Sequence, residues 1–317
     1  MAKYLLKRIV QTFVVIIMVS MLTFLLVSLL PGDPVYIYSG STDISQEEYD
    51  NIYHKLNLDD PLPVRYVEWV SGVLHGDFGT SYRYHTPVWE LIGSRIGITL
   101  YLSILAVAIG MPIGVLFGLL TAINRGKKTD TIITLIANIT SCLPQFWIAM
   151  CVMLVFSLKM GLLPATGFVW PWEDFGEHIK HLIMPLFCLA LGGIASTTRQ
   201  TRSSMLEVMR QDYIRTARSK GVIERKVITK HMLKNGLLPI VTLVATRLAH
   251  IIGGSMFVET VFMIPGMGTL IVNCITSRDV PVLQALVMVT SGVTCIVYIL
   301  TDLAYMVIDP RISLVED

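Results

Sequence analysis

Six long apolar runs recur along this 317-residue chain, and they constrain its fold more than any other feature. The runs are residues 9–30, 96–124, 131–158, 182–198, about 235–263 and 280–301, the last of which can continue to residue 308. A helix needs roughly 20 apolar residues to cross a bilayer, and backbone polar groups in lipid must pair within their own segment. We therefore predict an all-α membrane protein with six transmembrane helices.

The composition is consistent with lipid as part of the solvent. Only 15% of the residues are charged, 53% are hydrophobic, and the mean hydropathy is +0.64. Soluble domains carry about 25% charged residues, so this chain has too few charges to cover a surface that faces only water. No stretch is both basic and aromatic, so no nucleic-acid partner is indicated.

The first apolar run superficially resembles a secretion signal, because Lys3, Lys7 and Arg8 precede it. However, its 22 residues are enough to cross the bilayer core at about 1.5 Å per residue. Pro-Gly-Asp-Pro follows it, where a signal peptide would carry a cleavage site with small residues. We interpret residues 9–30 as a retained membrane helix.

The charges between the runs predict the orientation. Residues 31–95 hold ten acidic residues against four basic ones, whereas residues 199–234 hold ten basic residues against three acidic ones. Positive loops stay in the cytoplasm, so we place 199–234, the basic 124–130 loop and both termini inside, and 31–95 outside. The predicted division is 1–30, an extracytoplasmic segment 31–95, a transmembrane domain 96–308 containing a cytoplasmic loop 199–236, and a tail 309–317.

Two segments outside the runs have patterns of their own. In the outer segment, a turn at 59–63, a short amphipathic helix at 64–74 and a glycine turn at 76–79 indicate a small folded element. In the basic loop, residues 212–221 favour a short helix that Gly221 ends, and residues 224–235 favour a second helix. A loop that merely lies on anionic headgroups would need only a few Lys and Arg residues, not this layout.

Several short motifs match one family in the same order along the chain. They lie at residues 31–34 (Pro-Gly-Asp-Pro), 76–81, 215–221, 231–239, 258–262, 264–268 and 309–311. Together they resemble the dipeptide, oligopeptide and nickel permeases of ATP-binding-cassette (ABC) importers, whose coupling loop is the match at 215–239. The general Glu-Ala-Ala opening of that loop is replaced here by Arg215-Thr216-Ala217. This departure from the family pattern concerns residues that the resemblance places against the ATPase.

The resemblance implies a type I ABC importer fold and a set of partners in a bacterial inner membrane. These partners are a second homologous permease, two ABC ATPase subunits and an extracytoplasmic solute-binding protein. It also implies that ATP and Mg²⁺ bind to the ATPase subunits, and that this chain has no cofactor of its own. The expected ATPase-coupling residues are Asp212, Tyr213, Ile214, Arg215, Ala217, Lys220 and Gly221.

The runs themselves contain polar groups that are candidates for the translocation pathway. Asn138, Ser141 and Gln145 form a polar stripe on the third run, while the fifth contains the ionisable residues Arg247, His250 and Glu259. Ionisable groups at membrane depth cost about 3 kcal/mol or more unless they face water or a partner. The alternatives are hydrogen bonds between helices for the stripe, and a structural ion pair or a place near the headgroups for the ionisable groups.

Glycines and prolines also mark the runs. Gly110, Gly114 and Gly118 lie on one stripe of the second run, where they would let a neighbouring helix approach closely. Pro112, Pro144 and Pro185 lie within runs, and we expect each to kink its helix.

The chain lacks the motifs of an enzyme. It has no Gly-x4-Gly-Lys-Ser/Thr phosphate loop, no zinc-protease motif, and five cysteines without paired spacing. We therefore expect a non-catalytic membrane subunit. The resemblance to the permease family implies that it imports short peptides, with glutathione, nickel or a nickel chelate as alternative cargo. A channel or an ion-coupled secondary transporter is the alternative class, but inverted repeats with broken helices, which it would show, are not evident.

Overall fold

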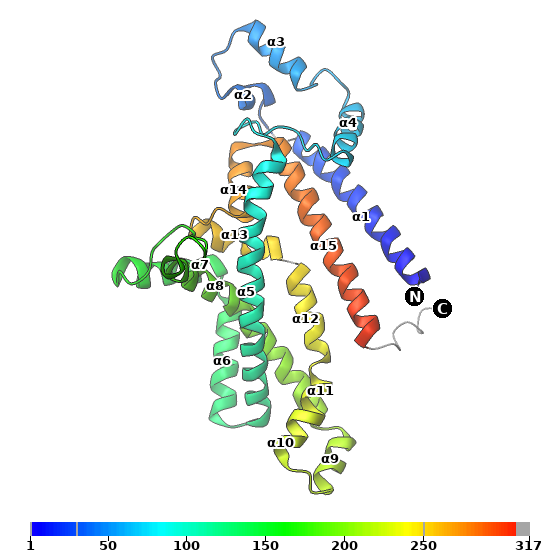
Figure 1. The fold of residues 1–317 in the computed structure, drawn as a ribbon, viewed down its shortest axis with the longest axis vertical. Coiled ribbons are helices and arrows are strands. Elements are labelled where there is room, and N and C mark those ends of the chain that lie inside the picture. Colours follow the sequence, from blue (N-terminus) through cyan, green and yellow to red (C-terminus); the bar gives the residue numbers. More distant parts are fainter. Residues whose placement is uncertain (1, 30, 250, 309–317) are drawn as a thin grey trace. The chain divides into compact units, whose positions relative to one another are not determined.

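The computed structural model describes residues 2–29, 31–249 and 251–308. In these residues the chain is helical and contains no strand, apart from one isolated bridge between Thr80 and Pro87 (Figure 1). The contacts divide it into two compact units, Met1–Thr99 with Pro265–Asp317, and Leu100–Ile264. We call them the terminal unit and the central unit, and describe each by itself.

Two long apolar helices form the membrane part of the terminal unit. α1 (Ala2–Ser28) and α15 (Val280–Ile308) pack side by side (Figure 1), and Arg8 Nε lies 2.9 Å from the Asp302 carboxylate. α14 (Met267–Ser277) precedes α15 and packs against it. Both long helices are long and apolar enough to cross a membrane.

The predicted folded element of residues 31–95 consists of three short helices in the terminal unit. They are α2 (Pro34–Ser39), α3 (Gln46–Lys55) and α4 (Leu62–Leu74), and α4 confirms the helix predicted at 64–74. The end of α1 holds α4, because the Phe24 ring packs edge-on against Tyr66 at 5.4 Å and Ser20 Oγ bonds the Tyr66 hydroxyl at 2.8 Å. These aromatic contacts fix the element on the membrane helix.

Asp279, at the start of α15, holds the turn that contains the bridge. Its buried carboxylate accepts hydrogen bonds from the Ser81 hydroxyl, from Tyr82 N at 3.0 Å and from Arg83 N at 3.3 Å. A buried carboxylate is tolerated only when donors satisfy it. The turn and the helix are therefore fixed to each other by one side chain.

Close packing of two long helices builds the central unit. α5 (Val88–Ile123) begins in the terminal unit and continues into the central unit, where it meets α8 (Phe175–Val208). A Cβ atom built on Gly114 would lie 2.5 Å from Thr197 Cβ, and one on Gly118 would lie 2.7 Å from Thr198 O. The predicted close approach along the glycine stripe is confirmed.

The third apolar run is broken rather than continuous. α6 (Lys128–Cys142) ends before Leu143 and Pro144, and α7 (Gln145–Val152) follows and continues into the π-helical segment η1 (Met153–Lys159). The helix formed by residues 145–159 is bent by 103° relative to α6. The run predicted over 131–158 is therefore bent at Pro144, where a kink was predicted, because proline offers no N–H to continue the helix. α5 and α8, by contrast, run uninterrupted through Pro112 and Pro185.

The fifth apolar run contains two helices, α12 (Leu238–Ala249) and α13 (Ile251–Val261). Residue 250, between them, lies outside the described residues. By length and composition, the described residues contain four helices that can cross a membrane, or five if the bent pair counts as one. The predicted fifth run, 235–263, includes residue 250, so its continuity as one helix lies outside the described residues.

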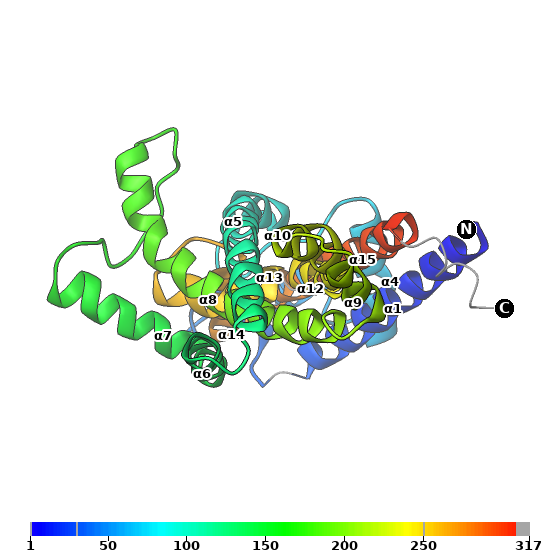
Figure 2. The same cartoon turned by 90° about the horizontal axis from the view of Figure 1, so that it is seen from below.

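The basic loop folds as a helical hairpin of the central unit. Its elements are α9 (Asp212–Ser219), α10 (Glu224–Lys226), η2 (Val227–Met232) and α11 (Leu233–Gly236). Both views place α9 beside α10 at one end of the unit (Figures 1 and 2). The two predicted helices at 212–221 and 224–235 are confirmed, although the second is π-helical in its middle.

Candidate functional site

The end of α9 is set by backbone chemistry. Gly221 has φ +74°, a left-handed conformation that costs a residue with a Cβ atom about 1 kcal/mol. Val222 N donates to Ala217 O at 3.2 Å, the six-residue bond that closes a helix in the Schellman motif. Gly221 therefore ends the helix as the sequence indicates, and turns the chain back towards η2.

One face of α9 is buried inside the chain. Ile214 is fully buried and Ala217 is 8% exposed. They pack in an apolar cluster with Ala122 at the end of α5, Met205 on α8, and Val227 and Met232 on η2. This face attaches α9 to two long helices of the central unit.

The other face of α9 is free of these contacts. The remaining predicted coupling residues, which are exposed, are Asp212, Tyr213, Arg215 and Lys220. The Tyr213 hydroxyl accepts a hydrogen bond from Asn235 Nδ2 at 3.0 Å, which connects α9 to α11. The predicted residues are thus divided between an internal face and an outward face.

A bidentate ion pair connects α9 to α10. Arg218 Nη2 and Nε lie 2.6 and 3.1 Å from the two oxygens of Glu224. The Arg218 guanidinium lowers the pKa of Glu224, and the carboxylate in turn raises the pKa of Arg218. Both side chains are exposed, and exposed pairs contribute little to stability. The pair therefore fixes the position of α10 relative to α9 but contributes little to the stability of the hairpin.

A polar cavity of about 390 Å³ lies within the central unit, among α5, α6, α7, α8, α12 and α13. Among its lining residues are Ser141, Gln145, Ser196, Arg199, Arg247 and Ser255. The cavity brings together three of the predicted pathway residues, Ser141, Gln145 and Arg247. It is the candidate translocation site of this chain.

Hydrogen bonds position both arginines of this cavity. Arg247 Nη2 donates to Gly192 O at 3.1 Å and to Ser196 Oγ at 2.6 Å, both on α8. Arg199, also on α8, donates through Nη1 to Ala137 O at 3.3 Å and to the Ser141 hydroxyl on α6. Two guanidinium groups from α8 and α12 therefore line one cavity.

The other three predicted pathway residues are placed differently. Asn138 is exposed and is not among the residues that line the cavity. Glu259 is fully buried and accepts a hydrogen bond from Ser255 Oγ at 2.7 Å, so it lies behind the lining. His250 lies outside the described residues.

Arg199 also lines a second cavity of about 570 Å³, together with Arg202, Glu207 and Arg210 of α8. Arg202 Nε and Nη2 donate to the two oxygens of Asp130, at 2.8 and 2.9 Å. These bonds lower the pKa of Asp130 to about 2, and Gly126 N adds a further bond to the carboxylate. The pair holds the 124–130 loop on α8.

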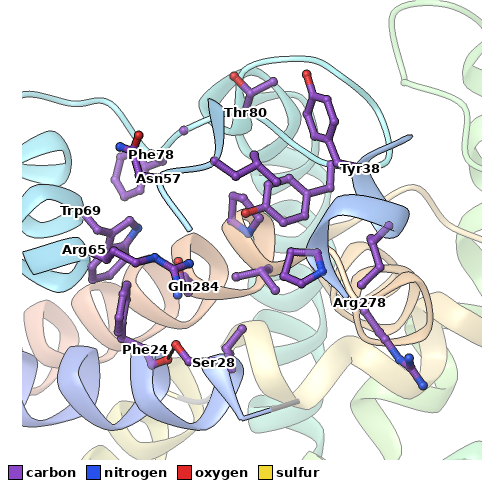
Figure 3. Close-up of a pocket in the computed structure, with 18 of the residues that line it drawn as sticks. Phe24, Ser28, Tyr38, Asn57, Arg65, Trp69, Phe78, Thr80, Arg278 and Gln284 are labelled. Carbon is purple, nitrogen blue, oxygen red and sulfur yellow. Dashed lines mark hydrogen bonds between the residues drawn. The ribbon is translucent and has the colours of Figure 1, made fainter. Parts of the chain in front are cut away.

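The terminal unit has a cavity of about 620 Å³ of its own. Figure 3 shows Arg65 and Trp69 of α4 directed into it, with Phe24 and Ser28 of α1 and Gln284 of α15 around them. Trp69 Nε1 is buried and has no hydrogen-bond partner among the described residues. Of these residues, Arg65 places a positive group in the cavity from the segment that we predict to be extracytoplasmic.

Arg199 and the Asp130–Arg202 pair were not singled out by the sequence. Arg199 directly follows the fourth apolar run and counted only as a positive loop charge, but α8 continues to Val208. The signal that could have revealed it is helical spacing: positions 192, 196, 199, 203, 206 and 210 form one face of a helix. Among the described residues, no group of three His, Cys, Asp or Glu side chains could hold a metal ion.

Comparison with known families gives two matches that together cover almost the whole chain. Residues 114–314 match the family described as the binding-protein-dependent transport system inner membrane component. Residues 1–103 match the family of N-terminal regions of binding-protein-dependent transport system membrane components.

Similar proteins match from end to end. A putative peptide permease protein of Brucella ovis is 40% identical over 317 residues, covering 99% of each chain. The oligopeptide transport system permease protein AppB of Bacillus subtilis is 37% identical over 316 residues, covering 99% of this chain and 100% of that protein.

Solved structures show the same fold at low identity. A chain of the MetNI methionine ABC transporter, in inward-facing conformations, has a TM-score of 0.58 at 17% identity and covers 69% of this chain and 96% of that chain. A chain of an amino acid ABC transporter crystallised with histidines has a TM-score of 0.51 at 17% identity, covering 68% and 92%. The predicted type I importer fold is confirmed.

Proposed function

This chain belongs to the family of binding-protein-dependent transport system inner membrane components, and from that premise we propose that it is half of the pathway of an ATP-driven importer of short peptides. The observation that carries the choice of cargo is the match of 37–40% identity, from end to end, to proteins named as peptide or oligopeptide permeases. Glutathione, nickel and nickel chelates are the alternative cargo.

The proposed complex contains a second homologous permease, two ABC ATPase subunits and a solute-binding protein. The ATPase subunits bind ATP and Mg²⁺, and this chain needs no cofactor of its own. In the proposed orientation, both termini, the 124–130 loop and α9 are cytoplasmic, whereas 31–95 faces outward and receives the binding protein. Arg65, which lines the cavity of the terminal unit, supports this receiving role.

The proposed coupling runs through α9. Asp212, Tyr213, Arg215 and Lys220 contact the ATPase, because they lie on the exposed face of the helix. Ile214 and Ala217 pass its motion to α5 and α8, since they pack on the ends of both. Gly221 lets the chain turn directly after the helix. ATP therefore biases a two-state membrane element through a mechanical contact.

The polar cavity of the central unit is the proposed pathway in this chain. It has Ser141, Gln145, Arg199 and Arg247 in its lining, which offer hydrogen-bond donors and positive charge within an apolar helix bundle. Ionisable groups in a membrane segment mark substrate pathways when they face a water-filled cavity.

The test is uptake by the complete complex in proteoliposomes, with the binding protein outside and Mg-ATP inside. We expect radiolabelled trialanine to accumulate with ATP and to enter at background rate with a non-hydrolysable analogue. Excess unlabelled peptide should compete, whereas glutathione and Ni²⁺ should not. Accumulation of glutathione or nickel in place of trialanine would replace the cargo, and uptake independent of ATP would indicate a channel instead.

A further inference from the structure

The polar cavity of the central unit carries positive charge without a matching acid in its lining. Arg199 and Arg247 both line it, and none of its lining residues among the described part of the chain is Asp or Glu. Glu259, bonded to the lining residue Ser255, is fully buried and is not itself in the lining. The surface presented to the cavity is cationic.

The donors of the two guanidinium groups are only partly used. A guanidinium has five N–H donors in a planar fork. The recorded bonds of Arg247 use Nη2 alone, and those of Arg199 use Nη1 alone. These bonds fix each side chain on a neighbouring helix and leave the other nitrogens for a ligand. An orienting bond of this kind is the support that a pre-organised binding site needs.

Electrostatics indicate what the ligand is. Two like charges that share a cavity between apolar helices raise each other's energy, and the low local dielectric strengthens the effect. An anion between them removes this repulsion and accepts from both forks. Arginine binds carboxylate bidentately, and the hydroxyls of Ser141 and Ser196 add neutral donors beside the charges.

Arg199 also connects this cavity to the second one. It lines both, and the second continues along the same face of α8 to Arg202 and Arg210. The positive charge of that second cavity is largely offset, because Arg202 is paired with Asp130 and Glu207 also lines it. The two cavities therefore differ in charge, although Arg199 lines both.

We propose that Arg199 and Arg247 form a binding site for the carboxylate of the cargo. For a peptide this is the C-terminal carboxylate, so the inference rests on the proposed function. It assigns the permease its own part in selecting cargo, separate from that of the solute-binding protein.

The experiment is equilibrium dialysis of the permease–ATPase complex in nanodiscs, without the binding protein, against radiolabelled trialanine or trialanine amide. The wild-type complex should bind trialanine at least about tenfold more tightly than the amide, because only the acid pairs with the guanidinium groups. Arg199→Gln and Arg247→Gln should each remove most of this preference. Arg247→Lys, which keeps the charge, should retain part of it.

Arg125→Gln is the matched control, because Arg125 is exposed in the 124–130 loop and lines neither cavity. It should leave the preference unchanged. Each variant must co-purify with its ATPase and elute as the wild type does, which separates loss of the site from loss of folding.

Equal binding of acid and amide by the wild type, no binding of either, or a preference retained by both Gln variants would overturn the proposal. Competition by inorganic phosphate as strong as that by trialanine would also overturn it, since the site would then be a general anion site. These failures leave ATP-dependent uptake of trialanine intact. Failure of the proposed function abolishes that uptake in the wild type.

Discussion

At the scale of single residues, two aspartates hold segments that are distant in sequence. Asp130 holds the 124–130 loop on α8 through Arg202, and Asp279 holds the turn at Ser81–Arg83 on α15. The sequence shows both only as loop acids near the end of an apolar run. Their partners are 72 and about 197 residues away, and no local pattern specifies a pairing at such a distance.

Asp130 should give a stability that depends on pH. Its pKa falls from 3.8 to about 2 in the folded chain because Arg202 donates to it. A lowered pKa stabilises the fold above the unfolded value near 3.8, and this contribution is lost as the pH falls through about 2. The shift corresponds to about 2 kcal/mol.

The measurement is the thermal midpoint of the purified chain in detergent. Asp130→Asn should unfold at a lower temperature than the wild type at pH 7, and the gap should narrow as the pH falls from about 5 to 2, because the wild-type carboxylate is protonated there. A gap that stays constant over this range would contradict the role of the ion pair.

Asp279→Ala should be more damaging than a surface change. It leaves the Ser81 hydroxyl and the Tyr82 N–H without their buried acceptor, and each unsatisfied group costs about 1–3 kcal/mol. We expect a loss of about 3 kcal/mol in the free energy of unfolding. Asp43→Ala, at an exposed position, is the control and should change it by less than about 0.5 kcal/mol. Similar losses of unfolding free energy for the two variants would contradict the role of Asp279 in holding the turn at Ser81–Arg83 on α15.

At the scale of elements, the sequence predicts those parts that have a local cause. The helix stop at Gly221, the helix at 64–74 and the glycine stripe of α5 were all predictable, because each depends on spacing or on one residue's backbone freedom. The break at Pro144 was only partly so. Proline predicts a kink but not its size, and Pro112 and Pro185 leave their helices uninterrupted.

The glycine stripe gives a prediction with an internal control. Gly118→Ala places a Cβ about 2.4 Å from Thr201 Cβ, which forces α5 and α8 apart, so we expect a loss of about 1–3 kcal/mol. Gly93→Ala, in the same helix, meets nothing within 4 Å and should be neutral or stabilising. Thermal midpoints in detergent measure both, and equal effects would mean that the stripe is not a packing contact.

The two faces of α9 should separate in mutants. Ile214→Ala removes a fully buried side chain, which typically costs 2–5 kcal/mol, and should loosen the hairpin and lower uptake. Arg215→Ala together with Lys220→Ala should leave the free energy of unfolding within about 0.5 kcal/mol of the wild-type value. This double variant should instead reduce co-purification with the ATPase. If the exposed pair destabilised the chain and the buried residue did not, the assignment of faces would be reversed.

At the scale of the whole molecule, apolar run lengths and loop charges were enough to predict a multi-pass membrane protein, and the resemblance of the short motifs implied a permease. None of these could predict the polar cavity, because its residues come from α5, α6, α7, α8, α12 and α13, which only tertiary packing brings together. Ser141, Gln145 and Arg247 were found because polar groups are conspicuous in apolar runs. Arg199 was not, because it lies just beyond the predicted end of its run, where a positive charge is ordinary.

The central claim is that α9 is the contact between this chain and the ATPase, on the cytoplasmic side. The most direct measurement is photocrosslinking in the assembled complex, with benzoylphenylalanine at Arg215 on the exposed face of α9 or at the exposed Leu74 of α4. We predict a crosslink to the ATPase subunit from position 215 and none from position 74. An ATPase crosslink from position 74, or none from position 215 in a complex that hydrolyses ATP, would contradict the account.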